Sequence, residues 1–212
     1  MTTVLLHGLG QEPKSWEAVA SGLEGEVLRP DLFAPVRGGT ATYQAIYQAF
    51  ARYGEGLGAP LRLCGLSLGG ILALQYAAEH PERVRALALI GTQFVMPKGL
   101  LKLQNGIFRL MPHGVFRQMG LPKGDVIDLT NSMLDLDFRE ALGRVSCPAL
   151  VLCGERDRAN QKAARGLQEG LPQSKLRWIP GAGHEANREA PEALAEILRG
   201  FFRETGELGG RD

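Results

Sequence analysis

The feature that most constrains the fold of this chain is the alternation of short β-rich segments with segments of helical periodicity. Parallel strands must be joined by crossover connections, which are usually helices. The pattern therefore predicts an α/β fold, with a mostly parallel sheet of about six strands flanked by helices. The expected strands span residues 2–8, 25–32, 60–65, 83–91, 147–154 and 174–181. The expected helices span residues 12–23, 40–53, 67–79, 160–169 and 191–204, and Thr40 or Thr42 is the expected N-cap of the second helix.

Length and charge argue against several classes of protein. A chain of 212 residues suits one compact domain, and a net charge of +1 gives no general reason to expect a nucleic-acid partner. No apolar run approaches the roughly 20 residues that cross a bilayer, so we expect no stable membrane insertion. The first residues lack the features of a signal peptide. Cys64, Cys147 and Cys153 lie in or beside apolar runs, which predicts buried, reduced thiols and a cytoplasmic location.

One long segment, residues 92–143, interrupts the alternation. It connects the fourth expected strand to the fifth and is too long for a simple connection. In an open α/β sheet the binding crevice lies beyond the carboxyl ends of the strands, and this segment leaves from such an end. We therefore expect a core of residues 1–91 and 144–204, a short helical cap of residues 92–143 and a flexible tail of residues 205–212.

A single serine stands between glycines where the third expected strand ends. The sequence "GLSLGG" places Gly65 and Gly69 around Ser67, directly before a helix. A turn this tight strains the backbone of its middle residue, and glycines on both sides remove side chains that would collide. Ser67 would then lie at the N-terminus of the helix, where free N–H groups favour an oxyanion. The alternative is that Ser67 only caps the helix.

A serine hydroxyl needs a general base before it can act as a nucleophile. His184 lies in a glycine-rich loop after the last expected strand, at the same edge of the sheet as Ser67, and is the predicted base. His7 ends the first strand and is expected to shape a loop. His80 is expected at a helix end, and His113 in a solvated position on the cap.

The base needs an orienting carboxylate. Asp157 follows the fifth expected strand, at the same edge, and is the predicted acid, with Glu155 in the same loop as the alternative. The chain order Ser67, Asp157, His184 is the order associated with a nucleophile elbow. The other aspartates considered lie in the cap, away from any strand end: Asp125, Asp128, Asp135 and Asp137.

The stretch "HGLG", residues 7–10, suits a role in binding an oxyanion. Acyl transfer passes through a tetrahedral oxyanion, which two backbone N–H groups should meet. The N–H of Leu68 is one candidate, and the N–H of Leu9 is the other, because the glycines beside Leu9 let that backbone approach closely.

Taken together, these motifs resemble those of the α/β-hydrolase superfamily, in particular its small carboxylesterases, enol-lactonases and C–C hydrolases. The resemblance rests on "HGLG", "GLSLGG", "CPALVLCGERD" and "GAGHEANREAPEAL", which spread over nearly the whole chain outside the cap. It implies an α/β-hydrolase fold in which Leu9 is the oxyanion-hole residue, Ser67 the nucleophile, Asp157 the acid and His184 the base.

Two departures from the family pattern are visible. The family sheet usually opens with an antiparallel pair of strands, whereas this chain starts at what resembles the third strand. Many relatives carry Asp-x-Arg-Gly-x-Gly-x-Ser where this chain has "PDLFAPVRGGTATY". The serine nucleophile itself argues against dehalogenase and epoxide-hydrolase chemistry, because both need a carboxylate at that position.

The cap segment is basic and amphipathic. Apolar residues fall near one helical face, and the pocket residues expected from this segment are Phe94, Met96, Leu103, Ile107 and Met111. From residue 94 to residue 124 there is no acidic residue, but there are five cations, Lys98, Lys102, Arg109, Arg117 and Lys123. Three interpretations stay open: an apolar roof with solvated lysines, cations that favour an anionic substrate, or a helix that touches a membrane surface.

The sequence therefore predicts a serine hydrolase that acts on small carboxylic esters or related acyl compounds and needs no cofactor or metal. Its expected partner is a small-molecule acyl substrate, with an anionic substrate as one option. Two alternatives remain. The same triad could perform C–C hydrolysis, lyase, acyl-transfer or perhydrolase chemistry, or the chain could be a non-catalytic ligand-binding protein.

Overall fold

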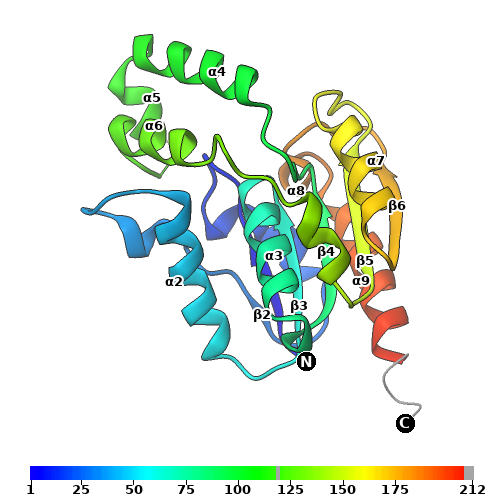
Figure 1. Ribbon diagram of the computed structural model, residues 1–212. Coiled ribbons are helices and arrows are strands. Elements are labelled where there is room, and N and C mark those ends of the chain that lie inside the picture. Colours follow the sequence, from blue (N-terminus) through cyan, green and yellow to red (C-terminus); the bar gives the residue numbers. More distant parts are fainter. Residues whose placement is uncertain (118–119, 208–212) are drawn as a thin grey trace.

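The computed structural model describes residues 1–117 and 120–207 and contains a parallel sheet, which confirms the predicted fold class (Figure 1). The strand order is β2-β1-β3-β4-β5-β6, and every strand pair in this sheet is parallel. The sheet of the described residues therefore has no antiparallel opening pair, in agreement with the departure seen in the sequence. The strands are β1 (Thr3–Leu6), β2 (Val27–Leu28), β3 (Leu61–Leu66), β4 (Val84–Ile90), β5 (Ala149–Gly154) and β6 (Ser174–Ile179).

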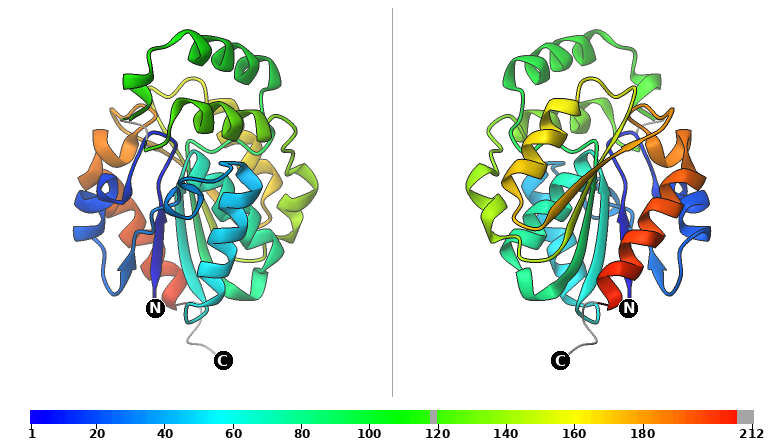
Figure 2. Two further views of the ribbon diagram at one scale, coloured as in Figure 1. Left: turned by 90° about the vertical axis from the view of Figure 1, so that its left-hand side faces the viewer. Right: turned by 90° about the vertical axis from the view of Figure 1, so that its right-hand side faces the viewer.

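Helices cover both faces of the sheet (Figure 2). The core on one face is built with α2, α3 and α7, and the core on the other face with α1, α8 and α9. The α-helices are α1 (Glu17–Ser21), α2 (Tyr43–Glu55), α3 (Leu68–Glu79), α4 (Lys98–Leu110), α5 (His113–Arg117), α6 (Lys123–Ser132), α7 (Gln161–Gly170), α8 (Ala186–Glu189) and α9 (Pro191–Glu207). Short 3-10 helices occur at η1 (Pro13–Trp16), η2 (Ala34–Val36), η3 (Pro81–Arg83) and η4 (Arg139–Arg144).

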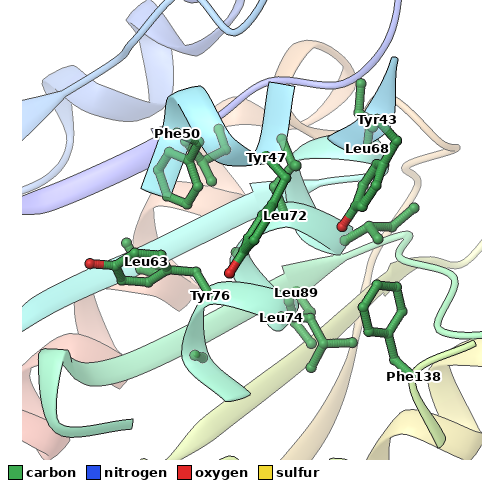
Figure 3. Packing of buried hydrophobic residues seen from close by; sticks show 14 of the residues in the cluster. Tyr43, Tyr47, Phe50, Leu63, Leu68, Leu72, Leu74, Tyr76, Leu89 and Phe138 are labelled. Atoms are coloured by element: carbon green, nitrogen blue, oxygen red, sulfur yellow. The ribbon is translucent and has the colours of Figure 1, made fainter. Parts of the chain in front are cut away.

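The packing of α2 against α3 illustrates how local signals fix the helices. Thr42 is the N-cap of α2, and its Oγ1 accepts a hydrogen bond from the backbone N of Ala45 at 3.2 Å. Tyr43, Tyr47 and Phe50 of α2 are buried, and the ring of Phe50 packs against that of Tyr76 of α3 with the centroids 5.3 Å apart (Figure 3). A side chain of this size contributes roughly 1.5–3 kcal/mol when it is fully buried. Tyr53, near the end of α2, is exposed. At its end, α3 is capped by His80, as expected for a helix-terminus residue.

Two predicted boundaries are wrong. The second strand comprises only Val27–Leu28, because the chain turns away at residues 29–32 and Asp31 accepts hydrogen bonds from the backbone N–H groups of Phe33 and Ala34. The last helix continues to Glu207 instead of ending at 204, and Thr205 within it is buried. The predicted tail therefore begins inside a helix, and its residues 208–212 lie outside the described part.

Helices α4, α5 and α6 lie beyond the carboxyl ends of the strands (Figure 1). The segments that lead into and out of this region pair as a short antiparallel bridge, Val95 with Asp137. Backbone hydrogen bonds from Met96 to Leu136 and from Phe138 to Phe94, at 3.1 and 2.8 Å, complete this neck. The arrangement is the one that a cap over the sheet edge requires, and we retain residues 92–143 as the proposed cap.

Candidate active site

Ser67 occupies a strained turn between β3 and α3. Within the described part of the chain, Ser67 is the only non-glycine residue with a positive φ, and its φ is 53°. Such a conformation is rare for residues with a side chain and is found preferentially at functional sites. Ser67 stands at the N-cap position of α3, but its side chain makes no capping hydrogen bond. A purely capping role is therefore wrong.

The flanking glycines are needed for the turn, as the sequence predicts. A Cβ on Gly65 would lie 2.2 Å from the carbonyl oxygen of Gly69, and a Cβ on Gly69 would lie 2.3 Å from the carbonyl oxygen of Leu6. Both distances are far below van der Waals contact. The backbone of α3 can approach β1 and β3 this closely only with glycine at both positions.

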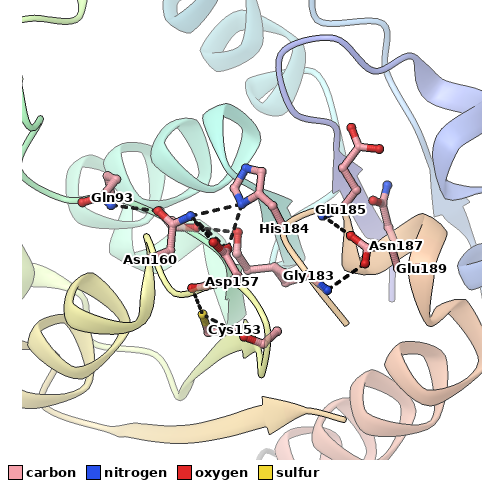
Figure 4. Close-up of polar contacts among 12 residues, drawn as sticks. Gln93, Cys153, Asp157, Asn160, Gly183, His184, Glu185, Asn187 and Glu189 are labelled. Atoms are coloured by element: carbon pink, nitrogen blue, oxygen red, sulfur yellow. Dashed lines mark hydrogen bonds and ion pairs between the residues drawn. The ribbon is translucent and has the colours of Figure 1, made fainter. Parts of the chain in front are cut away.

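Asp157 and His184 are hydrogen-bonded to each other (Figure 4). The Oδ2 atom of Asp157 lies 2.8 Å from Nδ1 of His184. Burial alone would raise the pKa of Asp157, but hydrogen bonds from His184 and Asn160 outweigh it, and the pKa lies below the usual value. The hydrogen bond with Asp157 raises the pKa of His184, which burial opposes and the charges of Asp157, Glu185 and Glu189 reinforce. The pair is thus arranged as a carboxylate and an imidazole that readily takes up a proton.

A cavity of about 940 Å³ brings Ser67 and His184 together, since both residues line it. In the described part of the chain, the hydrogen-bond partners of the His184 ring are Asp157 and Asn160, and Ser67 is not one of them. Hydrogen bonds between a nucleophile and its base are often long in ligand-free structures. Gly91, with a φ of 53°, packs against the pair: a Cβ there would lie 3.0 Å from Nδ1 of His184 and 3.1 Å from Oδ2 of Asp157.

Of the other candidates for base and acid, His7 and Glu155 make hydrogen bonds elsewhere, and His113 is exposed. His7 is fully buried, its Nε2 accepts a hydrogen bond from the backbone N of Leu32, and burial lowers its pKa. This neutral ring shapes the loop, as expected. His113 is exposed at the start of α5. Glu155 accepts a hydrogen bond from the backbone N of Gly181 at 3.0 Å and fixes that turn.

The two predicted oxyanion donors lie at the same cavity. Leu9 and Leu68 both line it. The N–H of Leu68 is the first of α3 and so has no carbonyl partner within the helix. The loop that carries Leu9 passes close to Ser67, because a Cβ on Gly8 would lie 3.5 Å from Cβ of Ser67.

Sequence reasoning missed two contacts that hold the active-site loops. Gln11 and Asn187 are both buried and form reciprocal side-chain hydrogen bonds of 3.0 and 3.1 Å, which join the loop after β1 to α8. The carboxylate of Glu189 accepts hydrogen bonds from the backbone N of Gly183 and of Glu185, the two neighbours of His184 (Figure 4). An acid five residues after a loop histidine was visible in the sequence, but the Gln11–Asn187 contact had no local signal.

Only some of the cap residues expected to line the pocket border this cavity. Phe94 and Met96 line the cavity, but Leu103 and Ile107 are 63% and 52% exposed on the outer face of α4. Met111 packs against the core without lining the cavity. The inner face of α4 is a different one from that predicted. Phe108 is buried on it, and Leu101 and Gln104 line the cavity. The pocket assignment of Leu103 and Ile107 is therefore wrong.

The cations of the cap do not line the cavity in the described part of the chain. Lys98 pairs with Asp135 at 2.6 Å on the surface, and Nζ of Lys123 donates to the carbonyl oxygens of Arg109 and Met111 at the end of α4. The side chain of Arg117 lies outside the described part. The basic residues that line the cavity are instead Lys162 and Arg165, from α7.

The described residues hold no group of three or more histidine, cysteine, aspartate or glutamate side chains placed to bind a metal ion. Over the same residues, every helix is too short or too polar to cross a membrane.

Comparison with known proteins identifies the family of the chain and several named relatives. The model of the alpha/beta hydrolase family matches residues 3–197. A pimeloyl-[acyl-carrier protein] methyl ester esterase from Chromobacterium violaceum is 29% identical over 178 residues, which cover 66% of this chain and 70% of the relative. A 2-hydroxy-6-oxononadienedioate/2-hydroxy-6-oxononatrienedioate hydrolase from Dechloromonas aromatica is 27% identical over 182 residues, or 67% of this chain and 62% of the relative.

Solved structures share the fold over nearly the full length. A thermophilic esterase from Thermogutta terrifontis superimposes with a TM-score of 0.79 and 25% sequence identity, covering 97% of this chain and 90% of that structure. The family match over residues 3–197, the parallel sheet and the turn at Ser67 agree. The chain is therefore a member of the alpha/beta hydrolase family and a hydrolase of that kind.

Proposed function

We propose that the protein is a serine hydrolase that cleaves small carboxylic esters through an acyl-enzyme on Ser67, with Asp157 and His184 as its acid and base. One combined observation carries the proposal. Ser67, on a backbone turn with φ 53°, lines the same cavity as His184, whose Nδ1 lies 2.8 Å from the Asp157 carboxylate. The named esterase among the relatives supports the same reaction class.

The reaction divides into two similar halves. Nε2 of His184 takes the proton of the Ser67 hydroxyl while Oγ attacks the ester carbonyl, and the backbone N–H groups of Leu9 and Leu68 meet the resulting oxyanion. When the tetrahedral intermediate collapses, the single bond between the carbon under attack and the alcohol oxygen breaks. His184 then gives its proton to that leaving oxygen. Water then repeats the sequence on the acyl-enzyme and releases the carboxylic acid. Asp157 accepts the Nδ1–H of His184, which leaves Nε2 free to act as the base.

The cavity favours an acyl group that is largely apolar. Its volume of about 940 Å³ lies at the upper end of the usual range for small-molecule sites. Apolar side chains such as Ile71, Met96 and Met133 line much of it, while Lys162 and Arg165 stand on the α7 side. We propose a substrate with an apolar acyl chain and an anionic group that reaches these two cations. The dienedioate in one relative's name is a dicarboxylate, which supports this choice.

A second candidate uses the same three residues for C–C hydrolysis, lyase, acyl-transfer or perhydrolase chemistry. It is favoured by the similarity to a hydrolase of an oxo-dienedioate, a substrate that is not an ester by name. Product analysis with matched panels of esters, diketones and thioesters separates the two. The free, buried thiols of Cys64, Cys147 and Cys153 support a reducing, cytoplasmic location.

The decisive experiment replaces the nucleophile. Ser67→Ala should lower the hydrolysis of p-nitrophenyl butyrate by about 10⁴-fold or more, because no covalent intermediate can form. The variant should keep the circular dichroism spectrum and melting temperature of the parent or gain stability. The reason is that the lost hydroxyl makes no capping hydrogen bond to α3. A fluorophosphonate probe should label the parent at Ser67 and leave the variant unlabelled. Equal hydrolysis by parent and variant would refute the assignment, and an unlabelled parent would favour a non-catalytic ligand-binding protein.

A further inference from the structure

Asn160 stands where an asparagine ordinarily caps a helix, but its side chain does something else. It occupies the N-cap position of α7 and makes no side-chain capping hydrogen bond. Its Nδ2 atom instead donates to the Asp157 carboxylate, 2.9 Å from Oδ1 and 2.9 Å from Oδ2 (Figure 4). The usual structural reason for asparagine at this position is therefore absent.

Gln93 determines which way the amide of Asn160 points. Nε2 of Gln93 donates to Oδ1 of Asn160 at 2.8 Å. Since the amide oxygen accepts this bond, the amide nitrogen faces the carboxylate. Gln93 comes from the loop after β4 and Asn160 from the loop after β5, so the chain of contacts links the ends of two neighbouring strands.

The same amide nitrogen lies 3.1 Å from Nδ1 of His184. With Nδ1 of His184 protonated, both nitrogens are donors and converge side by side on the Asp157 carboxylate. Asn160 therefore shares the negative charge that Asp157 offers to His184. A carboxylate that gives part of its charge to a second donor attracts an imidazolium less strongly.

We propose that Asn160, oriented by Gln93, is a positioning residue that holds the Asp157 carboxylate in place and limits how tightly His184 binds its proton. The proposal rests on the proposed function, in which His184 must give up a proton in every cycle. A base that holds its proton too tightly is protonated at working pH and cannot accept one from Ser67.

Other charged and titratable groups surround this pair, and the tests leave them unchanged. Glu185 and Glu189 raise the pKa of His184 by their charges. The thiol of Cys153 lies 3.6 Å from the carbonyl oxygen of Asp157. Lys162, Arg165 and Glu169 of α7 line the same cavity as His184.

Asn160→Ala is the decisive test, because it removes the donated N–H and adds no charge. Asn160→Asp, in which the residue keeps its shape and caps a helix equally well, should enlarge the effect. It replaces the donated N–H by a second carboxylate. We expect the acidic limb of the kcat/KM profile to move to higher pH and kcat/KM at pH 7 to fall roughly 10-fold or more. Asn160→Ala should move the limb in the same direction. Because an added carboxylate would raise the pKa of His184 by its charge alone, the decision rests on Asn160→Ala, which only removes the donor. If Asn160 had only a structural role, Asn160→Ala would leave the profile unchanged, and that result would overturn the proposal.

Gln93→Leu tests whether Gln93 acts through Asn160. Alone, it should shift the acidic limb part of the way, because the amide loses the donor that orients it. In the Asn160→Ala background it should cause no further shift, because the amide that Gln93 orients is already absent. The effects of the two substitutions would then be non-additive. An equal effect in both backgrounds would show that Gln93 acts by another route. Gln168→Ala, at an exposed position of α7, the helix that follows Asn160, is the matched control and should leave the profile unchanged.

A measurement without turnover separates this proposal from the proposed function. In protein labelled with ¹⁵N-histidine, the imidazole signal of His184, identified by its loss in His184→Gln, should titrate at higher pH in Asn160→Ala than in the parent. An unchanged titration refutes the positioning role even if Ser67→Ala abolishes hydrolysis. A shifted titration in a protein that cleaves no ester keeps the positioning role and refutes the hydrolase. If Asn160→Ala fails to fold, the Asn160→Leu titration, which also removes the donor without adding a charge, decides in the same way.

Discussion

At the scale of single residues, the proposed active site depends on backbone positions that tolerate almost no change. Ser67 keeps a left-handed conformation that costs of order 1–3 kcal/mol. The hydrogen bond from its backbone N to the carbonyl oxygen of Ile90, at 2.9 Å, and the start of α3 hold it there. A side chain at Gly91 would crowd Asp157 and His184, and the φ of 53° there is strained for any residue other than glycine. The strain at Ser67 is therefore maintained by the backbone contacts of its neighbours.

The pH dependence of activity is a prediction at this scale. The Asp157 hydrogen bond raises the pKa of His184 above its ordinary value of 6.5, so activity should rise with pH through a midpoint above 6.5 and be lost in acid. Asp157→Asn removes the charge that stabilises the imidazolium, so the midpoint should move to lower pH. It should also lower kcat by about 10⁴-fold, because the amide no longer selects the productive tautomer. Profiles of kcat/KM for parent and variant check both statements. A midpoint that moves upward in Asp157→Asn contradicts them.

At the scale of elements, α4 shows why helical periodicity misled the pocket assignment. The apolar residues Leu103, Ile107 and Leu110 share one face, which hydrophobicity alone would turn inward, yet all three are exposed. The inner face contains Asn105, which is buried. Its amide accepts a hydrogen bond from Thr130 at 2.6 Å and donates one to Asn131 at 2.7 Å. Those partners lie on α6, and no pattern within α4 reveals them.

The two faces of α4 should respond differently to substitution. Phe108→Ala removes a buried ring that packs edge-on against Phe116 at 5.5 Å, so it should destabilise the cap by about 3 kcal/mol. Leu103→Ser and Ile107→Ser should change its stability by no more than about 0.5 kcal/mol, because both side chains already face solvent. Hydrogen exchange of the α4 and α6 amides measures the difference. Faster exchange in the serine variants than in Phe108→Ala would show that the faces are assigned the wrong way round.

At the scale of the whole molecule, the sequence predicted the elements better than the contacts between them. The sheet, the turn at Ser67 and the loop positions of Asp157 and His184 follow from strand ends and glycine spacing, which are local signals. The short β2 depends on how Asp31 binds the following backbone, and the cavity cations come from α7 instead of the cap. Asn160 reads as a helix cap until the positions of Asp157 and Gln93 are known. What could not be predicted is therefore pairing between residues far apart in the chain.

The Gln11–Asn187 contact is the clearest such pairing and yields a prediction. Gln11→Leu leaves Oδ1 of the buried Asn187 without a donor, while Nδ2 keeps only its bond to the carbonyl oxygen of Ser15, so it should destabilise the protein by about 1–3 kcal/mol. It should also lower kcat, because the loop of Leu9 and the segment after His184 lose their mutual anchor. The double variant Gln11→Leu/Asn187→Leu should recover part of the stability but not the activity. Thermal unfolding and ester hydrolysis measure the two effects. Additive losses of stability in the double variant would count against a direct coupling.

The antiparallel bridge between Val95 and Asp137 has a consequence for how this enzyme could diversify. It closes residues 96–136 into a module whose two ends meet, so a segment of another length or sequence can be exchanged there without disturbing the strand order. Phe94 and Met96, which border the bridge, also form part of the cavity wall. A transplanted module would therefore border the cavity from the start. Substrate selectivity could then change while the proposed reaction at the edge of the sheet stays the same.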